Sequence, residues 1–117
     1  MNIHLFDRDE QSQAYAVGQT IFQAGDPGEH MYAVIDGSVD IIIRGKTVET
    51  VGAGGVFGEM ALVEDRARIA TAQVNTAAKL VQIDRKRFEF LVQQNPYFAL
   101  QLMAVMARRL RRMDEKL

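Results

Sequence analysis

The chain has 117 residues, 48% of them apolar, with two prolines and no cysteine. This composition is typical of one compact domain spanning 1–117, and the length leaves no room for a second. The lack of cysteine excludes a disulfide framework and a thiolate metal site. Residues 1–10 lack the apolar run of a signal peptide, and no stretch is apolar enough to span a bilayer, so we expect a cytoplasmic protein without a membrane segment.

The net charge of −1 conceals an asymmetry along the chain. Residues 1–78 contain five basic and eleven acidic residues, whereas residues 79–117 contain nine basic and four acidic. Overall charge therefore gives no support for nucleic-acid binding. Any anion site in the first part of the chain must depend on local geometry.

Short runs of β-branched residues punctuated by glycine extend from Ala14 to Asp84, a pattern typical of antiparallel strands joined by tight turns. Asp36-Gly37 and Gly45-Lys46 supply the positive φ that hairpin turns need. The pattern predicts a mainly β fold, a barrel or roll over about residues 14–83. The expected strands are Ala14–Val17, Thr20–Gln23, Met31–Ile35, Val39–Arg44, Thr47–Val51, Ala70–Val74 and Lys79–Ile83.

After Ile83 the apolar residues recur every three or four positions, which predicts a helix over about 84–94 with Asp84 as its N-cap. Asn95-Pro96 repeats the signal, because proline is favoured at the first position of a helix. A final helix is therefore expected over about 96–117.

The final helix carries an apolar seam with alternating spacings of four and three residues, as in a coiled coil. The seam comprises Ala99, Met103, Met106, Leu110, Met113 and Leu117. It would pair with a second copy of the chain or pack on its own barrel, and the sequence leaves both open. The flanking arginines, Arg108, Arg109, Arg111 and Arg112, look like a nucleic-acid patch, but we favour a solvated face that suits the negative end of the helix.

The most irregular stretch runs from Val56 to Val74. Gly58 permits a sharp turn, and Glu59 to Leu62 can form one helical turn with free N–H groups. Arg68 adds a planar, permanently charged fork suited to phosphate. Glu59 can accept a hydrogen bond from a sugar hydroxyl, so the stretch indicates a nucleotide site. The alternative is that Glu59 and Arg68 simply pair across a turn.

This stretch resembles the phosphate-binding cassette of cyclic-nucleotide-binding domains, as in catabolite activators, cyclic-nucleotide-dependent kinases and cyclic-nucleotide-gated channels. Asp26-Pro27-Gly28-Glu29 and the Met31–Val34 run resemble the family's second turn and hairpin, so the likeness covers about residues 14–117. The resemblance implies a jelly-roll-like β-roll, or double-stranded β-helix, with a short cassette helix and two C-terminal helices.

The resemblance also implies which residues hold the ligand. Gly58 and Glu59 would hold the ribose, the N–H groups of Met60 and Ala61 would face the cyclic phosphate, and Arg68 would pair with its charge. The two residues after Arg68 would complete the wall, and the two before Gly58 would add apolar surface. The implied set is Val56, Phe57, Gly58, Glu59, Met60, Ala61, Arg68, Ile69 and Ala70.

Ile69 departs from the family's pattern, because it cannot donate the hydroxyl hydrogen bond that guanine-selective members use. We therefore expect cAMP to be preferred over cGMP, in a regulatory module that moves its C-terminal helices on binding. The bulk of Ile69 leaves open a degenerate module that binds no cyclic nucleotide and serves as an interaction or dimerisation domain.

No catalytic constellation is present, so we expect no enzymatic activity and no cofactor. His4 and His30 are far apart and lack a carboxylate at ligand spacing, which argues against a metal site. A DNA-binding regulator would require a helix-turn-helix, and we expect no such element in this chain.

Overall fold

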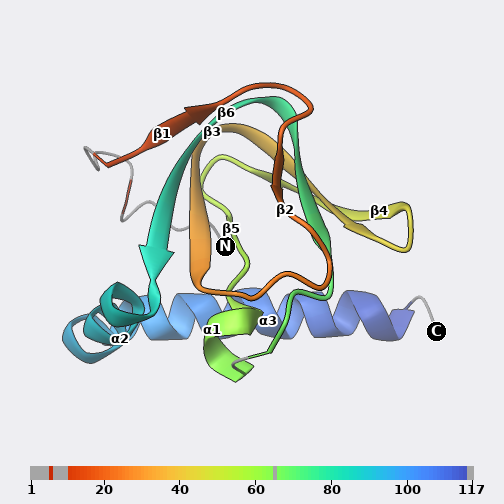
Figure 1. Cartoon of the computed structure of the whole chain (residues 1–117). Coiled ribbons are helices and arrows are strands. Elements are labelled where there is room, and N and C mark those ends of the chain that lie inside the picture. Colours follow the sequence, from red (N-terminus) through yellow and green to blue (C-terminus); the bar gives the residue numbers. More distant parts are fainter. Residues whose placement is uncertain (1–5, 7–10, 65, 116–117) are drawn as a thin grey trace.

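The computed structural model describes residue 6 and residues 11–64 and 66–115, with side chains described up to Arg112. The predicted mainly β fold with one short and two C-terminal helices is confirmed (Figure 1). The elements are β1 (Gln13–Tyr15), β2 (Thr20–Phe22), β3 (His30–Ile43), β4 (Lys46–Gly52), β5 (Val56–Phe57), α1 (Met60–Glu64), β6 (Thr71–Asp84), α2 (Arg85–Gln94) and α3 (Pro96–Glu115).

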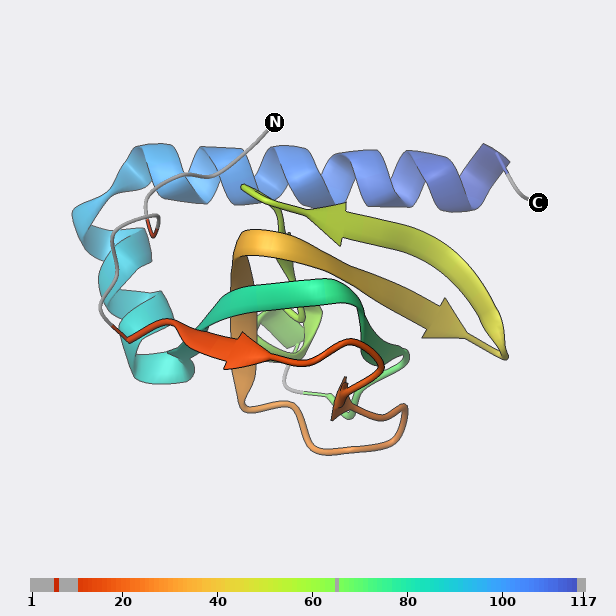
Figure 2. The same cartoon turned by 90° about the horizontal axis from the view of Figure 1, so that it is seen from above.

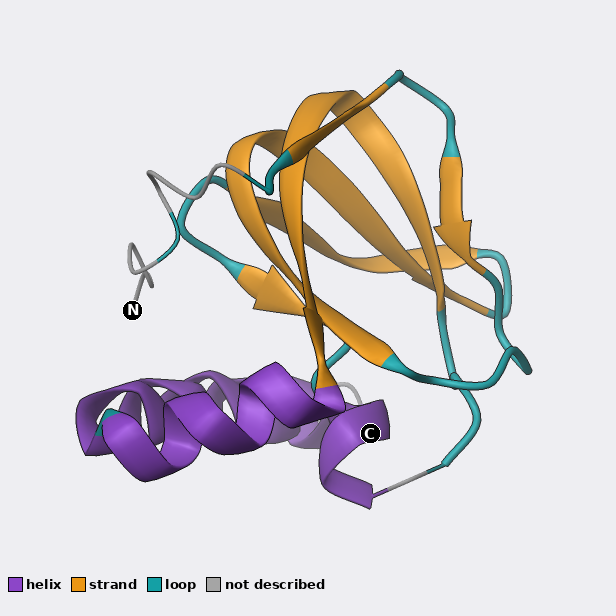
Figure 3. Cartoon of the chain, turned by 60° about the vertical axis from the view of Figure 1, so that its left-hand side comes forward, coloured by secondary structure: helices purple, strands orange, loops and turns teal. Residues whose placement is uncertain are grey.

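Two long antiparallel strands, β3 and β6, form the frame of the sheet, and each is 14 residues long. β4 and β5 pair with β3, while β1 and β2 pair with β6. The long strands bend so that the sheet closes on itself, and all three helices gather on one side of it (Figure 3). The arrangement is the predicted β-roll.

The predicted hairpin turn at Asp36-Gly37 is wrong. Both residues lie within the continuous strand β3, whose pairing with β6 shifts register on either side of them. Gly37 does have a positive φ of 80°, and an added Cβ there would lie 2.1 Å from the Ala77 carbonyl oxygen. The glycine therefore makes a bulge that bends the strand without reversing it. The two strands expected between Ala70 and Ile83 are likewise the single strand β6.

The hairpin turn predicted at Gly45-Lys46 exists, but it lies one residue earlier in the chain. Ile43 pairs with Lys46, so Arg44 and Gly45 form the tip between β3 and β4. Their φ values of 53° and 78° place both central residues in the left-handed region, as a type I′ turn requires.

Both C-terminal helices begin where the capping signals predict. Asp84 Oδ1 accepts a hydrogen bond from the Arg87 amide at 2.8 Å, and Asn95 Oδ1 accepts one from the Phe98 amide at 3.2 Å. α3 then runs alongside the roll, with α2 folded back at its start (Figures 1 and 2).

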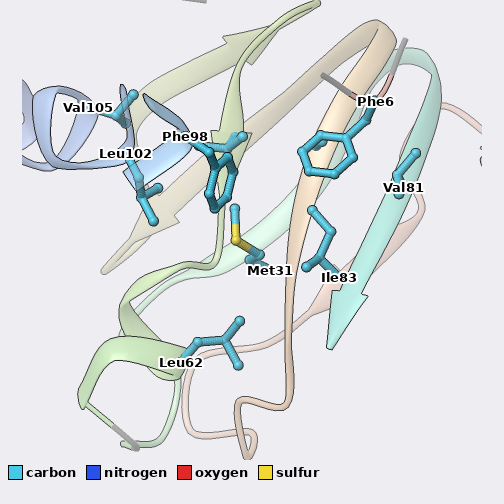
Figure 4. Packing of buried hydrophobic residues seen from close by; sticks show 10 residues of the cluster. Phe6, Met31, Leu62, Val81, Ile83, Phe98, Leu102 and Val105 are labelled. Atoms are coloured by element: carbon cyan, nitrogen blue, oxygen red, sulfur yellow. The ribbon is translucent and has the colours of Figure 1, made fainter. Parts of the chain in front are cut away.

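A buried apolar cluster joins the roll to α1 and α3 (Figure 4). Met31 and Ile83 contribute from the roll, Leu62 from α1, and Phe98 and Leu102 from α3. Burial of each such side chain stabilises the fold by about 1.5–3 kcal/mol. The remaining members are Phe6, Ala33, Val56, Val81 and Val105.

The predicted seam on the last helix does not pack on the roll as a unit. Met106 contacts the buried cluster, but Met103 and Leu110 are 62% and 61% exposed. The buried face of α3 is instead formed by Phe98, Leu102 and Val105. The side chain of Met113 and the whole of Leu117 lie outside the described residues.

Candidate functional site

Gly58 follows β5, precedes α1 and lies in contact with Arg68. Its φ of 81° lies in the left-handed region, and an added Cβ would come within 2.9 Å of Arg68 Nη1. The Gly58 carbonyl accepts a hydrogen bond from that same nitrogen at 2.7 Å. Glycine is thus required both for the turn and for the close approach of the arginine.

Arg68 is held as a buried cation, with only 8% of the residue exposed. Nη2 donates to the His30 carbonyl, and the guanidinium carbon lies 4.0 Å from the centre of the Phe22 ring. Burial lowers the pKa of Arg68, while electrostatic interactions with Tyr32, Glu59 and Asp26 act in the opposite direction.

Arg68 Nε is buried and has no hydrogen-bond partner among the described residues. A buried donor of this kind is costly unless a polar or anionic group pairs with it. The arginine is therefore equipped to receive an anion.

The turn between β2 and β3 clamps the cassette. The backbone of Arg68 exchanges two hydrogen bonds with it, donating to the Asp26 carbonyl and accepting from the Gly25 amide, each at 2.8 Å. Gly28 lies against the cassette helix, since an added Cβ would be 2.0 Å from the Ala61 Cβ. The turn thereby fixes both the arginine and α1.

Glu59 is the second charged group in the site and is 1% exposed. Its carboxylate accepts a hydrogen bond from Arg109 Nη1 on α3. Within the parts of the chain that are described, no ion pair joins Glu59 to Arg68, so the suggestion that these two simply pair across a turn is wrong.

Arg109 also donates to Glu49 on β4 and to the Val56 carbonyl. Its Nε lies 2.9 Å from Glu49 Oε1 and its Nη2 3.2 Å from Glu49 Oε2, a bidentate contact. Burial alone would lower the pKa of Arg109, but the charges and hydrogen bonds of Glu59 and Glu49 outweigh it and raise that pKa.

The expectation of a solvated arginine face is therefore wrong for Arg109, although Arg111 and Arg112 are exposed. A signal for its burial was available, because Arg109 follows Val105 by four residues and so continues the buried face of α3. Its acidic partners lie 50 and 60 residues earlier in the chain, where sequence patterning does not reveal them.

The other expected site residues are distributed around this cluster. Val56 and Phe57 are buried in the apolar core, where Phe57 stacks on Tyr32 with ring centroids 5.1 Å apart. Ala61 and Ala70 are buried, and Met60 is partly exposed. Ile69 is 66% exposed.

In the described part of the chain, no helix is long and apolar enough to cross a membrane. No group of three or more histidine and carboxylate side chains is gathered there as a metal site would require.

Solved structures with this fold are found at recognisable sequence identity. The Thermus thermophilus catabolite activator protein is 33% identical, with a TM-score of 0.80 over 91% of this chain and 52% of its own. The cAMP-bound PfPKA-R is 28% identical, with a TM-score of 0.75 over 89% of this chain and 36% of its own. The cGMP-bound EAL enzyme Bd1971 is 28% identical, with a TM-score of 0.69 over 91% and 30%.

The chain thus spans about half of the Thermus protein and about a third of the other two. The family model for the cyclic nucleotide-binding domain matches residues 12–95, which include the clamping turn, the cassette and α2. From this match, and from the roll and cassette described above, the chain belongs to the cyclic nucleotide-binding domain family.

Proposed function

We propose that residues 1–117 form one cytoplasmic, non-enzymatic regulatory domain that binds cAMP in preference to cGMP and repositions α2 and α3 on binding. The observation that carries this proposal is the buried guanidinium of Arg68, whose Nε lacks a partner in the described structure. It lies beside Gly58 at the start of the cassette helix. A cyclic phosphate would supply the missing acceptor and compensate the buried charge.

Glu59 provides the complementary half of the proposed site. A carboxylate has two oxygens, and the contact with Arg109 uses only Oε1. The other oxygen would accept a hydrogen bond from the ribose hydroxyl of the nucleotide. An arginine for the phosphate and a carboxylate for the sugar together favour a nucleotide over inorganic phosphate.

The ligands of the similar proteins support a cyclic nucleotide but leave the base open. PfPKA-R has cAMP bound, and Bd1971 occurs in both cAMP-bound and cGMP-bound forms. The preference for cAMP therefore rests on Ile69, whose exposed side chain offers no hydrogen bond to a guanine amino group.

A movement of α1 would be transmitted to α3 through packed side chains. Leu62 of α1 packs in the same buried cluster as Phe98 and Leu102 of α3 (Figure 4). Close-packed side chains transmit small displacements, so a nucleotide that shifts α1 would change the preferred position of α3.

Calorimetric titration with cAMP and cGMP tests the proposal. The wild-type domain should bind cAMP more tightly than cGMP, and R68A should abolish the binding of both. R111A removes an exposed arginine of α3 and should bind like the wild type. A wild-type domain that binds neither nucleotide in the micromolar range would refute the proposal and favour the interaction-module alternative.

The exposed apolar face of α3, formed by Leu100, Met103 and Leu110, supports a second proposal. We propose that it pairs with the same face of a second copy, because Met103 and Leu110 belong to the heptad seam and are mostly exposed. Dimerisation in this way is compatible with nucleotide binding at the cassette.

A further inference from the structure

Glu49 lies on β4, outside the cassette. It binds Arg109, the residue of α3 that also binds Glu59 of the cassette. Its side chain is 20% exposed, and both of its oxygens accept hydrogen bonds from Arg109. Arg112 adds a longer contact, with Nη1 3.7 Å from Glu49 Oε1. Glu49 thereby links two turns of α3 to the edge of the roll.

Arg109 is shared between two carboxylates. Nη1 binds Glu59, Nε and Nη2 bind Glu49, and Nη2 also donates to the Val56 carbonyl. Glu59 is the more deeply buried of the two, so it depends on a positive partner. The planar guanidinium can satisfy Glu59 only if it is held in the correct plane, and the bidentate contact with Glu49 fixes that plane.

We propose that Glu49 is a positioning residue for the nucleotide site: it orients Arg109, and Arg109 presents the Glu59 carboxylate to the sugar hydroxyl and holds α3 on the roll. Without the charge of Glu49, Arg109 loses its two-point attachment to β4. Glu59 then loses its fixed partner, and α3 loses a polar anchor beside its buried apolar face.

The docking of α3 on the roll and the binding of the nucleotide are thermodynamically linked. If docking of α3 improves nucleotide binding by some factor, nucleotide binding must improve docking by the same factor. Arg109 and the sugar hydroxyl can occupy different oxygens of Glu59, so the two contacts support each other and do not compete. The Glu49–Arg109–Glu59 chain thus makes docked α3 and bound nucleotide favour one another.

The ligand half of this inference rests on the proposed function, and a ligand variant tests it. E49Q keeps the shape of the side chain but removes its charge, and it should weaken cAMP binding about tenfold, as expected for one lost charge-assisted contact. The loss should be much smaller for 2′-deoxy-cAMP, which lacks the hydroxyl that Glu59 would accept. Equal losses for both ligands would show that Glu49 does not act through Glu59 and would overturn the proposal.

The proposed role of Glu49 in holding α3 on the roll is tested without any nucleotide, by hydrogen exchange of the backbone amides of α3. E49Q should accelerate exchange around Arg109, and E49D, which retains the charge, should restore part of the protection. E89Q makes the same change of charge at an exposed position on α2 and should have no effect on α3. Unchanged α3 exchange in E49Q would overturn the proposal whether or not the protein binds nucleotide.

The two arms separate the inference from the proposed function. A domain that binds no cyclic nucleotide but exposes α3 in E49Q would refute the proposed function and support the docking role of Glu49. A domain that binds cAMP equally well in wild type and E49Q would support the proposed function and overturn the role of Glu49.

Discussion

Gly28 lies where the turn between β2 and β3 touches the cassette helix. The φ of Gly28 is not in the left-handed region, so glycine is needed here for steric reasons. An added Cβ would overlap the Ala61 Cβ at 2.0 Å and lie 3.3 Å from Arg68 Nε. We expect G28A to lower the free energy of unfolding by about 1–3 kcal/mol, the usual cost of overpacking. Because α1 must move aside, cAMP binding should also weaken.

Urea denaturation and calorimetry measure these two effects. Gly52 provides a matched control, because an added Cβ there meets nothing within 4 Å and its φ is also outside the left-handed region. G52A should leave both stability and affinity near the wild-type values. If G28A matched G52A in both measurements, the turn would not clamp the cassette as described.

The charged residues of the site differ in how far the sequence could predict them. Glu59 and Arg68 lie in one irregular stretch, so local spacing was enough to identify both as site candidates. Arg109 and Glu49 meet only because β4 and α3 are brought together by the roll, 60 residues apart in the chain. Contacts of this kind depend on tertiary packing, which periodicity and composition do not encode.

Arg85, the first residue of α2, connects that element to the cassette helix. Its Nη1 donates to the Leu62 carbonyl at 2.8 Å and its Nη2 to the Ala61 carbonyl at 3.5 Å. These carbonyls lie in the last turn of α1, where a helix leaves acceptors unsatisfied and favours a positive charge. Arg85 is thus a polar tether from α2 to α1.

R85A should therefore loosen α1 selectively. A lost hydrogen bond of about 1 kcal/mol corresponds to roughly fivefold faster amide exchange where local opening limits it. We expect such acceleration within Met60–Glu64, measured by hydrogen exchange, and little change within β3. K86A, at the neighbouring exposed position, should leave α1 unaffected. Equal exchange of α1 in both variants would show that Arg85 does not tether the cassette helix.

At the scale of elements, the capping residues predicted helix starts well because a cap acts within three residues of itself. Strand continuity was harder to predict. Glycine with positive φ serves both a hairpin turn and a bulge, and only the partner strand distinguishes them. At Gly37 the partner β6 continues past the bend, whereas at Gly45 the chain reverses onto itself.

In the whole molecule, α3 has two apolar faces, one buried and one exposed. One face packs on the roll and α1, whereas the opposite face, with Leu100, Met103 and Leu110, is exposed. An exposed group of large apolar side chains on one helix face is typical of a protein–protein contact. The contacts of Arg109 with Glu49 and Glu59 lie on the first face, and the second face stays exposed to solvent.

We expect the domain to form a dimer through this exposed face, with a sedimentation coefficient that rises with protein concentration. The double variant M103E/L110E should sediment as a monomer at every concentration, because two like charges per chain would meet at the seam. V17E adds one acidic residue at a 65% exposed position in the loop between β1 and β2, across the roll from α3 in Figure 1, and should still dimerise. A wild-type domain that stays monomeric, or a double variant that still dimerises, would exclude this face as the interface.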